Sequence, residues 1–172
     1  MEIRLGQAED FSDIRLFYNR LASYMEGSKL DIFWRPGEYP SDSMIIDSLY
    51  NEDLILIEDE RGIIAACIVN SRFDASYGKI DWPSHISERY ADAIHVFGVH
   101  PFARNEGYAH KLMWCACEYS KVSDRKAIRI DVPATNKQAI RLCLSFGFQT
   151  AYTLPQQFGS NTVYFHLMER VF

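Results

Sequence analysis

The sequence predicts an α+β fold, in which a mixed, largely antiparallel sheet is covered by helices on both faces. The chain has 172 residues, the size of one domain, and 48% of them are hydrophobic, which suffices for a buried core. Apolar runs and amphipathic stretches follow one another in the order β-α-α-β-β-β-α-β-α-β-β, which disfavours an all-parallel doubly wound sheet. No repeat or linker divides the chain, so we expect a single domain over residues 1–172.

The N-terminal part is expected to form one strand and two helices. The segment EIRLGQ, residues 2–7, is typical of a short strand, and residues 8–25 place apolar side chains at helical spacing. Residues 30–40 form an aromatic loop that two prolines and a glycine interrupt. Ser41 is then expected to cap a second helix that extends to about Tyr50.

The middle of the chain is expected to hold three strands. Residues 53–59 and 62–70 are apolar runs whose spacing predicts a hairpin with Gly62 in its turn. A polar and aromatic connection follows at 71–92, and connections of this length inside a compact domain are often functional. The third strand of this part is expected at 93–100.

The C-terminal part is expected to alternate helices and strands. A helix over residues 107–122 precedes a strand at 126–132. Asn136 begins the next helix and Gly147 ends it, because glycine tolerates the positive φ that often terminates a helix. Two final strands are expected to pair antiparallel around a turn, with the strands at 148–154 and 162–169 and the turn at 155–161.

Charge and composition argue against several classes of protein. The net charge of −5 disfavours a nucleic-acid binder, which needs a basic surface to neutralise phosphates. No apolar run approaches the roughly 20 residues that span a bilayer, and the N-terminus lacks the apolar core of a signal peptide. Neither the histidines nor the cysteines have metal-ligand spacing, and we expect a cytoplasmic protein with reduced thiols at Cys67, Cys115, Cys117 and Cys143.

The most informative motif lies between the strand at 93–100 and the following helix. From Val99 to Ala109 the sequence reads V-x-P-x-x-R-x-x-G-x-A. A helix N-terminus leaves amide N–H groups unpaired and carries a partial positive charge, so such a loop can hold a pyrophosphate. Gly107 permits the tight turn and lets an anion approach bare backbone, whereas Arg104 either holds the loop or adds charge. The alternative is an ordinary strand-to-helix turn.

The neighbours of this motif favour the anion-binding interpretation. With RIDV and NKQAIRLCLSFGF downstream, residues 93–148 resemble the GNAT superfamily of acetyl-CoA-dependent N-acetyltransferases. The resemblance implies that Phe97, Gly98 and Val99 offer backbone groups to the pantetheine arm of acetyl-CoA, and that Asn136 also bonds this cosubstrate. It further implies that residues 102–109 wrap the pyrophosphate, which includes Arg104, Asn105, Glu106, Gly107, Tyr108 and Ala109.

The sequence departs from the family at the expected proton donor. In many members a tyrosine seven residues after the asparagine protonates the departing thiolate, and here that position is Cys143. A thiol with a pKa of about 8.5 could still donate a proton to the departing thiol, but a small apolar residue packed in the core is the simpler interpretation. Tyr152, Tyr164 or a water molecule are the alternatives.

His95 is the candidate general base. It lies on the strand that the resemblance assigns to the thioester, and a neutral imidazole suits the removal of a proton from an amine. The alternative is that strand alternation points His95 away from the cleft. The phase of the strand is open at this point, because a bulge is expected there.

The loops left to cover the cleft are expected to hold the acceptor. Phe33, Trp34, Tyr77 and Trp82 could wall an amine pocket, with Tyr39 beside them and Asp31, Glu38, Asp81 or Asp92 attracting the positive charge. A local aromatic cluster beneath the loops is the alternative. Trp114 falls off the apolar stripe of its helix, and so indicates either a homodimer contact or a half-buried ring.

The resemblance and these residues together predict an enzyme. We expect it to transfer acetyl from acetyl-CoA to a primary amine, by direct attack in a ternary complex, with a small molecule as acceptor. Two alternatives stay open. One is an acetyltransferase for the N-terminus or a lysine of a protein, and the other is a non-catalytic acyl-CoA-binding sensor.

Overall fold

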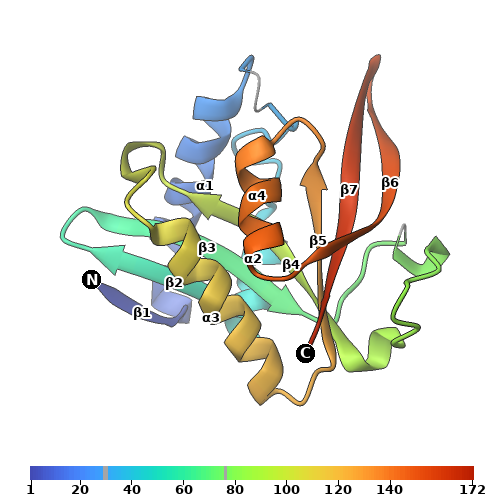
Figure 1. The fold of residues 1–172 in the computed structure, drawn as a ribbon. Coiled ribbons are helices and arrows are strands. Elements are labelled where there is room, and N and C mark those ends of the chain that lie inside the picture. The colour runs from blue at the N-terminus through green and yellow to red at the C-terminus, as the bar shows by residue number, and fades with distance from the viewer. Residues whose placement is uncertain (29–30, 76) are drawn as a thin grey trace. The chain divides into compact units, whose positions relative to one another are not determined.

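A seven-stranded sheet organises the chain. The structure, a computed structural model, describes residues 1–28, 31–75 and 77–172, so Leu30 of the expected acceptor loop and Ser76 of the 71–92 connection lie outside the described residues. The strands follow the order β1-β2-β3-β4-β5-β7-β6 across the sheet (Figure 1). Their bounds are β1 Glu2–Leu5, β2 Leu54–Asp59, β3 Gly62–Asn70, β4 Ala91–Val99, β5 Ala127–Pro133, β6 Gln149–Phe158 and β7 Asn161–Val171.

The pairing of the strands confirms the predicted mixed, largely antiparallel sheet. Strands β1 and β2, β2 and β3, β5 and β7, and β6 and β7 pair antiparallel. Strands β4 and β5 run parallel, and their pairing extends from Ala91↔Ala127 to Ile94↔Ile130. Within the described residues the α-helices are α1 Phe11–Met25, α2 Asp42–Tyr50, α3 Tyr108–Val122 and α4 Lys137–Ser145.

The chain forms two compact units. The first comprises Met1–Ile68 and His95–Cys115, and the second comprises Val69–Ile94 and Ala116–Phe172. The first unit therefore contains α1, α2 and the start of α3, whereas the second contains α4, β5, β6 and β7. A single domain over the whole chain stays a prediction.

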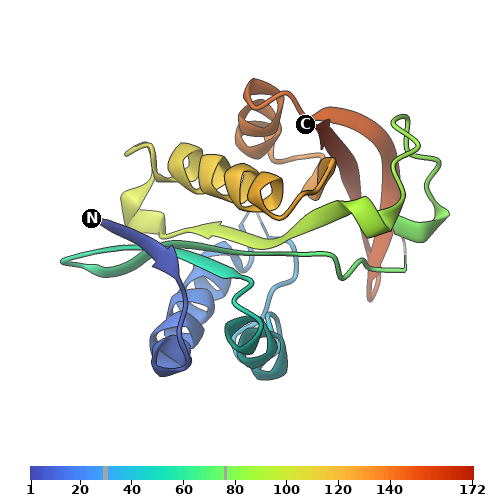
Figure 2. The same ribbon diagram turned by 90° about the horizontal axis from the view of Figure 1, so that it is seen from below.

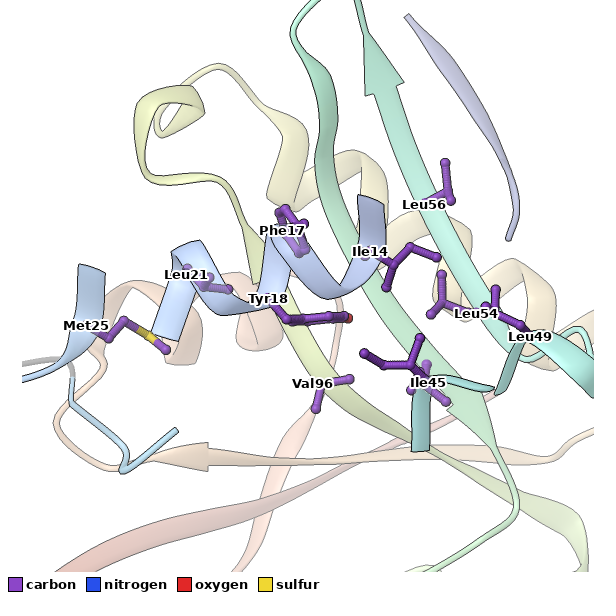
Figure 3. Packing of buried hydrophobic residues seen from close by; sticks show 12 residues of the cluster. Ile14, Phe17, Tyr18, Leu21, Met25, Ile45, Leu49, Leu54, Leu56 and Val96 are labelled. Atoms are coloured by element: carbon purple, nitrogen blue, oxygen red, sulfur yellow. The ribbon is translucent and has the colours of Figure 1, made fainter. Parts of the chain in front are cut away.

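The core of the first unit lies between its two N-terminal helices and its strands. In Figure 2, α1 and α2 lie on one face of these strands and the first half of α3 lies on the other. Apolar side chains of α1 and α2 interdigitate with those of the strands (Figure 3), and the cluster comprises Ile14, Phe17, Tyr18, Leu21, Met25, Ile45, Leu49, Leu54, Leu56, Ala66, Ile68 and Val96. Ser41 caps α2 as predicted, since its Oγ accepts a hydrogen bond from the Met44 amide at 3.2 Å.

The second unit has a core of its own beneath the long connection between β3 and β4. This connection contains two short 3₁₀ turns, Tyr77–Lys79 and Glu88–Tyr90. Tyr77 and Trp82 pack there against Ala93 and Leu167. The connection is therefore part of the packed structure of this unit.

Several predicted boundaries are wrong, most clearly in the last hairpin. Strands β6 and β7 continue through residues 155–158 and 161, so only Gly159 and Ser160 form the turn. Pro155 pairs with Tyr164 without loss because β6 is an edge strand, where the missing N–H leaves no ladder bond unmade. Gly159 has a φ of +61°, which a two-residue hairpin turn requires.

Two other boundaries differ by a few residues. The first helical segment starts as a 3₁₀ turn, Ala8–Asp10, before α1 begins. Strand β4 begins two residues earlier than predicted, because Ala91 pairs with Ala127. No helix in the described part of the chain is long and apolar enough to cross a membrane.

Candidate functional site

Strand β4 is irregular at Val96. This β-branched residue has a φ of +47°, a conformation that such side chains adopt only when the surrounding structure imposes it. After it, Gly98 is buried whereas Phe97 and Val99 are half-buried. A Cβ at Gly98 would lie 2.5 Å from Leu21 Cδ2 on α1, so a larger residue there would require the Leu21 side chain to move.

His95 precedes the irregular residue and is half-buried. Its Nε2 is shielded from solvent. The role of His95 as a base stays a prediction.

The loop between β4 and α3 combines two residues of positive φ with the N-terminus of a helix. A 3₁₀ turn, Pro101–Ala103, begins it, and His100 Nδ1 accepts a hydrogen bond from the Phe102 amide at 3.3 Å. Asn105 and Gly107 then both have positive φ, +67° and +81°. A Cβ at Gly107 would point into open space, so bare backbone faces outward at the N-terminus of α3. This loop therefore fits a pyrophosphate.

Side chains of the loop attach it to the rest of the first unit. The guanidinium of Arg104 lies 4.8 Å from the ring centroid of Tyr24 on α1, so Arg104 holds the loop. Glu106 forms an ion pair with Arg61 at 3.0 Å. Tyr108 is buried, while Ala109 is half-buried in the first turn of α3.

Asn136 is the N-cap of α4, as predicted. Its Oδ1 accepts a hydrogen bond from the Ala139 amide at 3.1 Å. The capping bond occupies the side-chain oxygen and leaves the amide NH₂ as the donor group. Bonding to a cofactor stays a prediction for this residue.

Cys143 is part of the core, and the prediction of a general acid there does not fit its surroundings. The residue is 1% exposed, and burial raises the pKa of its thiol to about 12. A group that weakly acidic is a poorer proton donor than an ordinary thiol. The tyrosines named as alternatives are accessible, since Tyr152 and Tyr164 on the last hairpin are each more than half exposed.

Tyr77 and Trp82 are core residues, which corrects the prediction that they wall an open pocket. They are 3% and 5% exposed, with ring centroids 5.6 Å apart. The indole Nε1 of Trp82 donates to the Tyr77 carbonyl at 3.2 Å, and its ring covers the buried guanidinium of Arg129 at 4.2 Å. The aromatic cluster that was the alternative is what forms here.

The other aromatic residues predicted near the acceptor lie in the first unit. Trp34 packs against Tyr18 and Tyr39 and is half-buried. Phe33 has a positive φ of +62°, and the guanidinium of Arg35 lies over its ring. Arg35 also pairs with Asp31 at 2.9 Å, which neutralises one of the carboxylates expected to attract an amine.

The structure also places two further predicted residues, Asp92 and Trp114. Asp92 is buried and bonded to Ser120 at 2.9 Å and Arg125 at 3.0 Å, so it belongs to the framework of the second unit. Trp114 is 57% exposed, and a homodimer contact there stays a prediction.

Asp131 is a candidate residue that the sequence analysis missed. It is the first residue of β5 beyond the pairing with β4, which ends at Ile94↔Ile130. The Tyr77 hydroxyl donates to its Oδ1 at 3.0 Å. Burial raises the pKa of this carboxyl, although the residue keeps part of its surface exposed. A partly accessible carboxylate with a raised pKa is a common feature of catalytic sites.

Comparisons with known proteins identify the family. The model of the acetyltransferase (GNAT) family matches residues 18–148. Among curated proteins, none matches the chain by sequence.

Solved structures share the fold at low identity. An acetyltransferase of the GNAT family from Streptococcus agalactiae has a TM-score of 0.79 and 17% identity, over 99% of this chain and 94% of that one. A putative acetyltransferase from Salmonella typhimurium, solved with its cofactor acetyl-CoA, has a TM-score of 0.72 and 17% identity, over 99% and 93%. A ribosomal-protein-alanine N-acetyltransferase from Brucella melitensis has a TM-score of 0.75 and 17% identity, over the full length of both chains.

Proposed function

Because this chain belongs to the acetyltransferase (GNAT) family and is an acyltransferase, we propose that it acetylates a primary amine of a small molecule. The acetyl donor of the family is acetyl-CoA. The proposed reaction is direct attack of the amine in a ternary complex. The observation that carries the proposal is the loop at 102–109, in which open backbone at Gly107 meets the N-terminus of α3.

The residues of the first unit fit the donor. Acetyl-CoA supplies an activated thioester when it is bound. The amides around Gly107 would hold its pyrophosphate, because they combine a positive φ, open space and a helix N-terminus. The backbone of Phe97–Val99, beyond the irregular Val96, would bond the pantetheine arm. In the second unit, the amide NH₂ of Asn136 is the group left to donate.

We propose Asp131 as the group that removes the proton from the amine. Its raised pKa brings the carboxylate closer in basicity to an ammonium group than an exposed aspartate would be. The Tyr77 hydroxyl orients the carboxylate by donating to Oδ1. His95 stays the competing candidate, and Tyr152 or Tyr164 are the candidates for the proton donor.

A small-molecule acceptor is supported by the aromatic loop of the first unit and by the acidic balance of the chain. Half-buried Trp34 and Phe33 offer flat apolar surface to a compact ligand. The net charge of −5 favours a cationic partner. Peptides that present an N-terminal amine or a lysine are the acceptors against which this proposal is tested.

The function is tested in two steps. Acetyl-CoA is expected to raise the melting temperature, because a ligand that binds only the folded state stabilises it. Release of free thiol is then measured over a panel of arylalkylamines, polyamines, amino sugars and peptides. Turnover with a small amine supports the proposal. Turnover with peptides alone would contradict the acceptor, a shift without turnover would indicate a sensor, and no shift at millimolar acetyl-CoA would contradict the donor.

The two candidate bases are separated by matched variants. Asp131→Asn is expected to lower kcat by about a hundredfold or more while the acetyl-CoA shift in melting temperature is kept. In the wild type, the rate should fall as the pH drops through the raised pKa of Asp131, because the protonated carboxyl cannot accept a proton. Asp74→Asn, which removes a neighbouring exposed charge, is the control. If His95→Ala loses most of its kcat while Asp131→Asn stays active, the base is His95 and not Asp131.

A further inference from the structure

Two arginines of the first unit form similar ionic networks. Only one of these networks includes the loop at residues 102–109, which we call the cofactor loop. Arg4 bonds Asp10 at 2.6 Å and Glu58 at 3.0 Å. Arg61 bonds Asp59 at 2.7 Å and Glu106 at 3.0 Å. Each guanidinium thus faces two carboxylates, and one carboxylate of each pair comes from the end of β2.

The Arg61 network joins the tip of the β2–β3 hairpin to the loop. Arg61 is in the hairpin turn, and its Nη2 lies 3.0 Å from Glu106 Oε2. The same Nη2 lies 3.0 Å from the hydroxyl of Tyr108, the first residue of α3. That hydroxyl also bonds Asp59 Oδ2 at 3.0 Å. Residues on both sides of Gly107 are therefore held by one hairpin.

The charges of this network influence how strongly an anionic ligand would bind to the loop. Glu106 is a carboxylate inside a loop that would hold a pyrophosphate, and alone it would repel that ligand. Arg61 bonds Asp59, Glu106 and Tyr108, so its guanidinium is held within the network and its charge acts on the loop through Glu106. The Asp59 side chain is 5% exposed, and Arg61 holds the pKa of its carboxyl far below the usual range.

We propose that Arg61 is a positioning residue for acetyl-CoA: it neutralises Glu106 and fixes the loop to the β2–β3 hairpin without touching the ligand. The proposal rests on the proposed function of the loop. It implies that a change at the hairpin tip alters affinity for acetyl-CoA and leaves the chemical step intact.

The test compares Arg61→Gln with Arg4→Gln. Dissociation constants of acetyl-CoA are measured by calorimetry, and kcat and KM are measured with the best amine. Arg61→Gln is expected to weaken acetyl-CoA binding by about fivefold to tenfold, since Glu106 then faces the phosphates without its cationic partner. The KM for acetyl-CoA should rise by the same factor with kcat unchanged. Arg4→Gln, which disrupts a network of the same composition, is expected to bind acetyl-CoA like the wild type.

A second variant distinguishes the proposed role from general damage. In Arg61→Gln/Glu106→Gln the repelling charge is gone, so most of the lost affinity should return. Equal affinities of Arg61→Gln and the wild type would overturn the proposal, as would a loss that Glu106→Gln does not relieve. If the wild type itself fails to bind acetyl-CoA, it is the proposed function that fails, which the same calorimetry shows before any variant is compared.

Discussion

Arginines in the two units are stabilised in opposite ways. Arg61, beside the loop at 102–109, has a side chain that is 41% exposed, and it pairs with the buried carboxylate of Asp59 and the exposed carboxylate of Glu106. Arg129, on β5 in the second unit, is fully buried and has one carboxylate, Glu169, at 3.1 Å. Its remaining contacts are the Ile86 carbonyl at 2.6 Å and the rings of Trp82 and Phe73.

This difference decides what each region tolerates. Arg61 and Glu106 are both exposed, so water compensates part of what each loses when the other is changed. The Arg129 side chain is fully buried, so its loss leaves the buried carboxylate of Glu169 without its cationic partner. We therefore expect the exposed charges of the first unit to act on ligand affinity, and the buried charges of the second unit to act on its stability.

The largest expected effect is on folding, at Arg129. Arg129→Met should lower the free energy of unfolding by about 3–5 kcal/mol, because removing one partner strands the buried carboxylate of Glu169. Urea unfolding measures the change. The double variant Arg129→Met/Glu169→Leu should recover most of it, since no buried charge remains. If Arg129→Met is as stable as the wild type, the expected difference between Arg129 and Arg61 is wrong.

A second, smaller effect concerns the loop of the first unit. Gly107→Asp should weaken acetyl-CoA binding by about a hundredfold, because a charged side chain enters the nest. The matched control is Gly147→Asp, since both glycines have a φ near +80° with open space around them. Both variants should lose about 1–2 kcal/mol of stability through backbone strain. If the thermal shift by acetyl-CoA survives in Gly107→Asp, the loop does not hold the pyrophosphate.

The smallest expected effect compares two buried tyrosines, one in each unit. Tyr77→Phe removes the hydrogen bond to Asp131 and should cost about 1 kcal/mol of stability. Tyr18→Phe should cost nothing, because no described residue bonds the buried Tyr18 hydroxyl. The Tyr77 bond lowers the pKa of Asp131 against the effect of burial, so Tyr77→Phe should also move the acidic limb of the pH–rate profile to higher pH. An unmoved limb would remove Asp131 from the rate-determining proton transfer.

The raised pKa of Asp131 also links activity to stability. A carboxyl whose pKa is higher in the folded state binds its proton more tightly there, so the charged form destabilises the fold. Stability is lost as the pH rises from the unfolded pKa through the folded one, and it is regained on acidification over that interval. Above its raised pKa, the charged carboxylate of Asp131 therefore lowers the stability of the fold, while the same raised pKa makes it a stronger base.

The sequence alone determined the order of the elements and the position of the glycine-containing loop at 102–109. Both depend on neighbours along the chain: helical spacing in residues 11–25, the cap at Asn136, and a glycine with positive φ at Gly107. These signals are local, because short patterns of residue type determine where helices begin and end. The same reasoning misjudged the last hairpin, because Pro155 is tolerated only where β6 lies at the sheet edge.

Only the tertiary structure decided which side chains are desolvated. In the sequence, Asp131 is one acidic residue among many. The Tyr77 hydroxyl that donates to it belongs to a residue 54 positions earlier in the chain. The sequence predicts Trp82 as a pocket residue, but its ring lies on the buried Arg129. For Cys143 the sequence left two interpretations open, and its burial decides for the core. The physical reason is that desolvation and charge pairing depend on segments far apart in the chain, which no local pattern records.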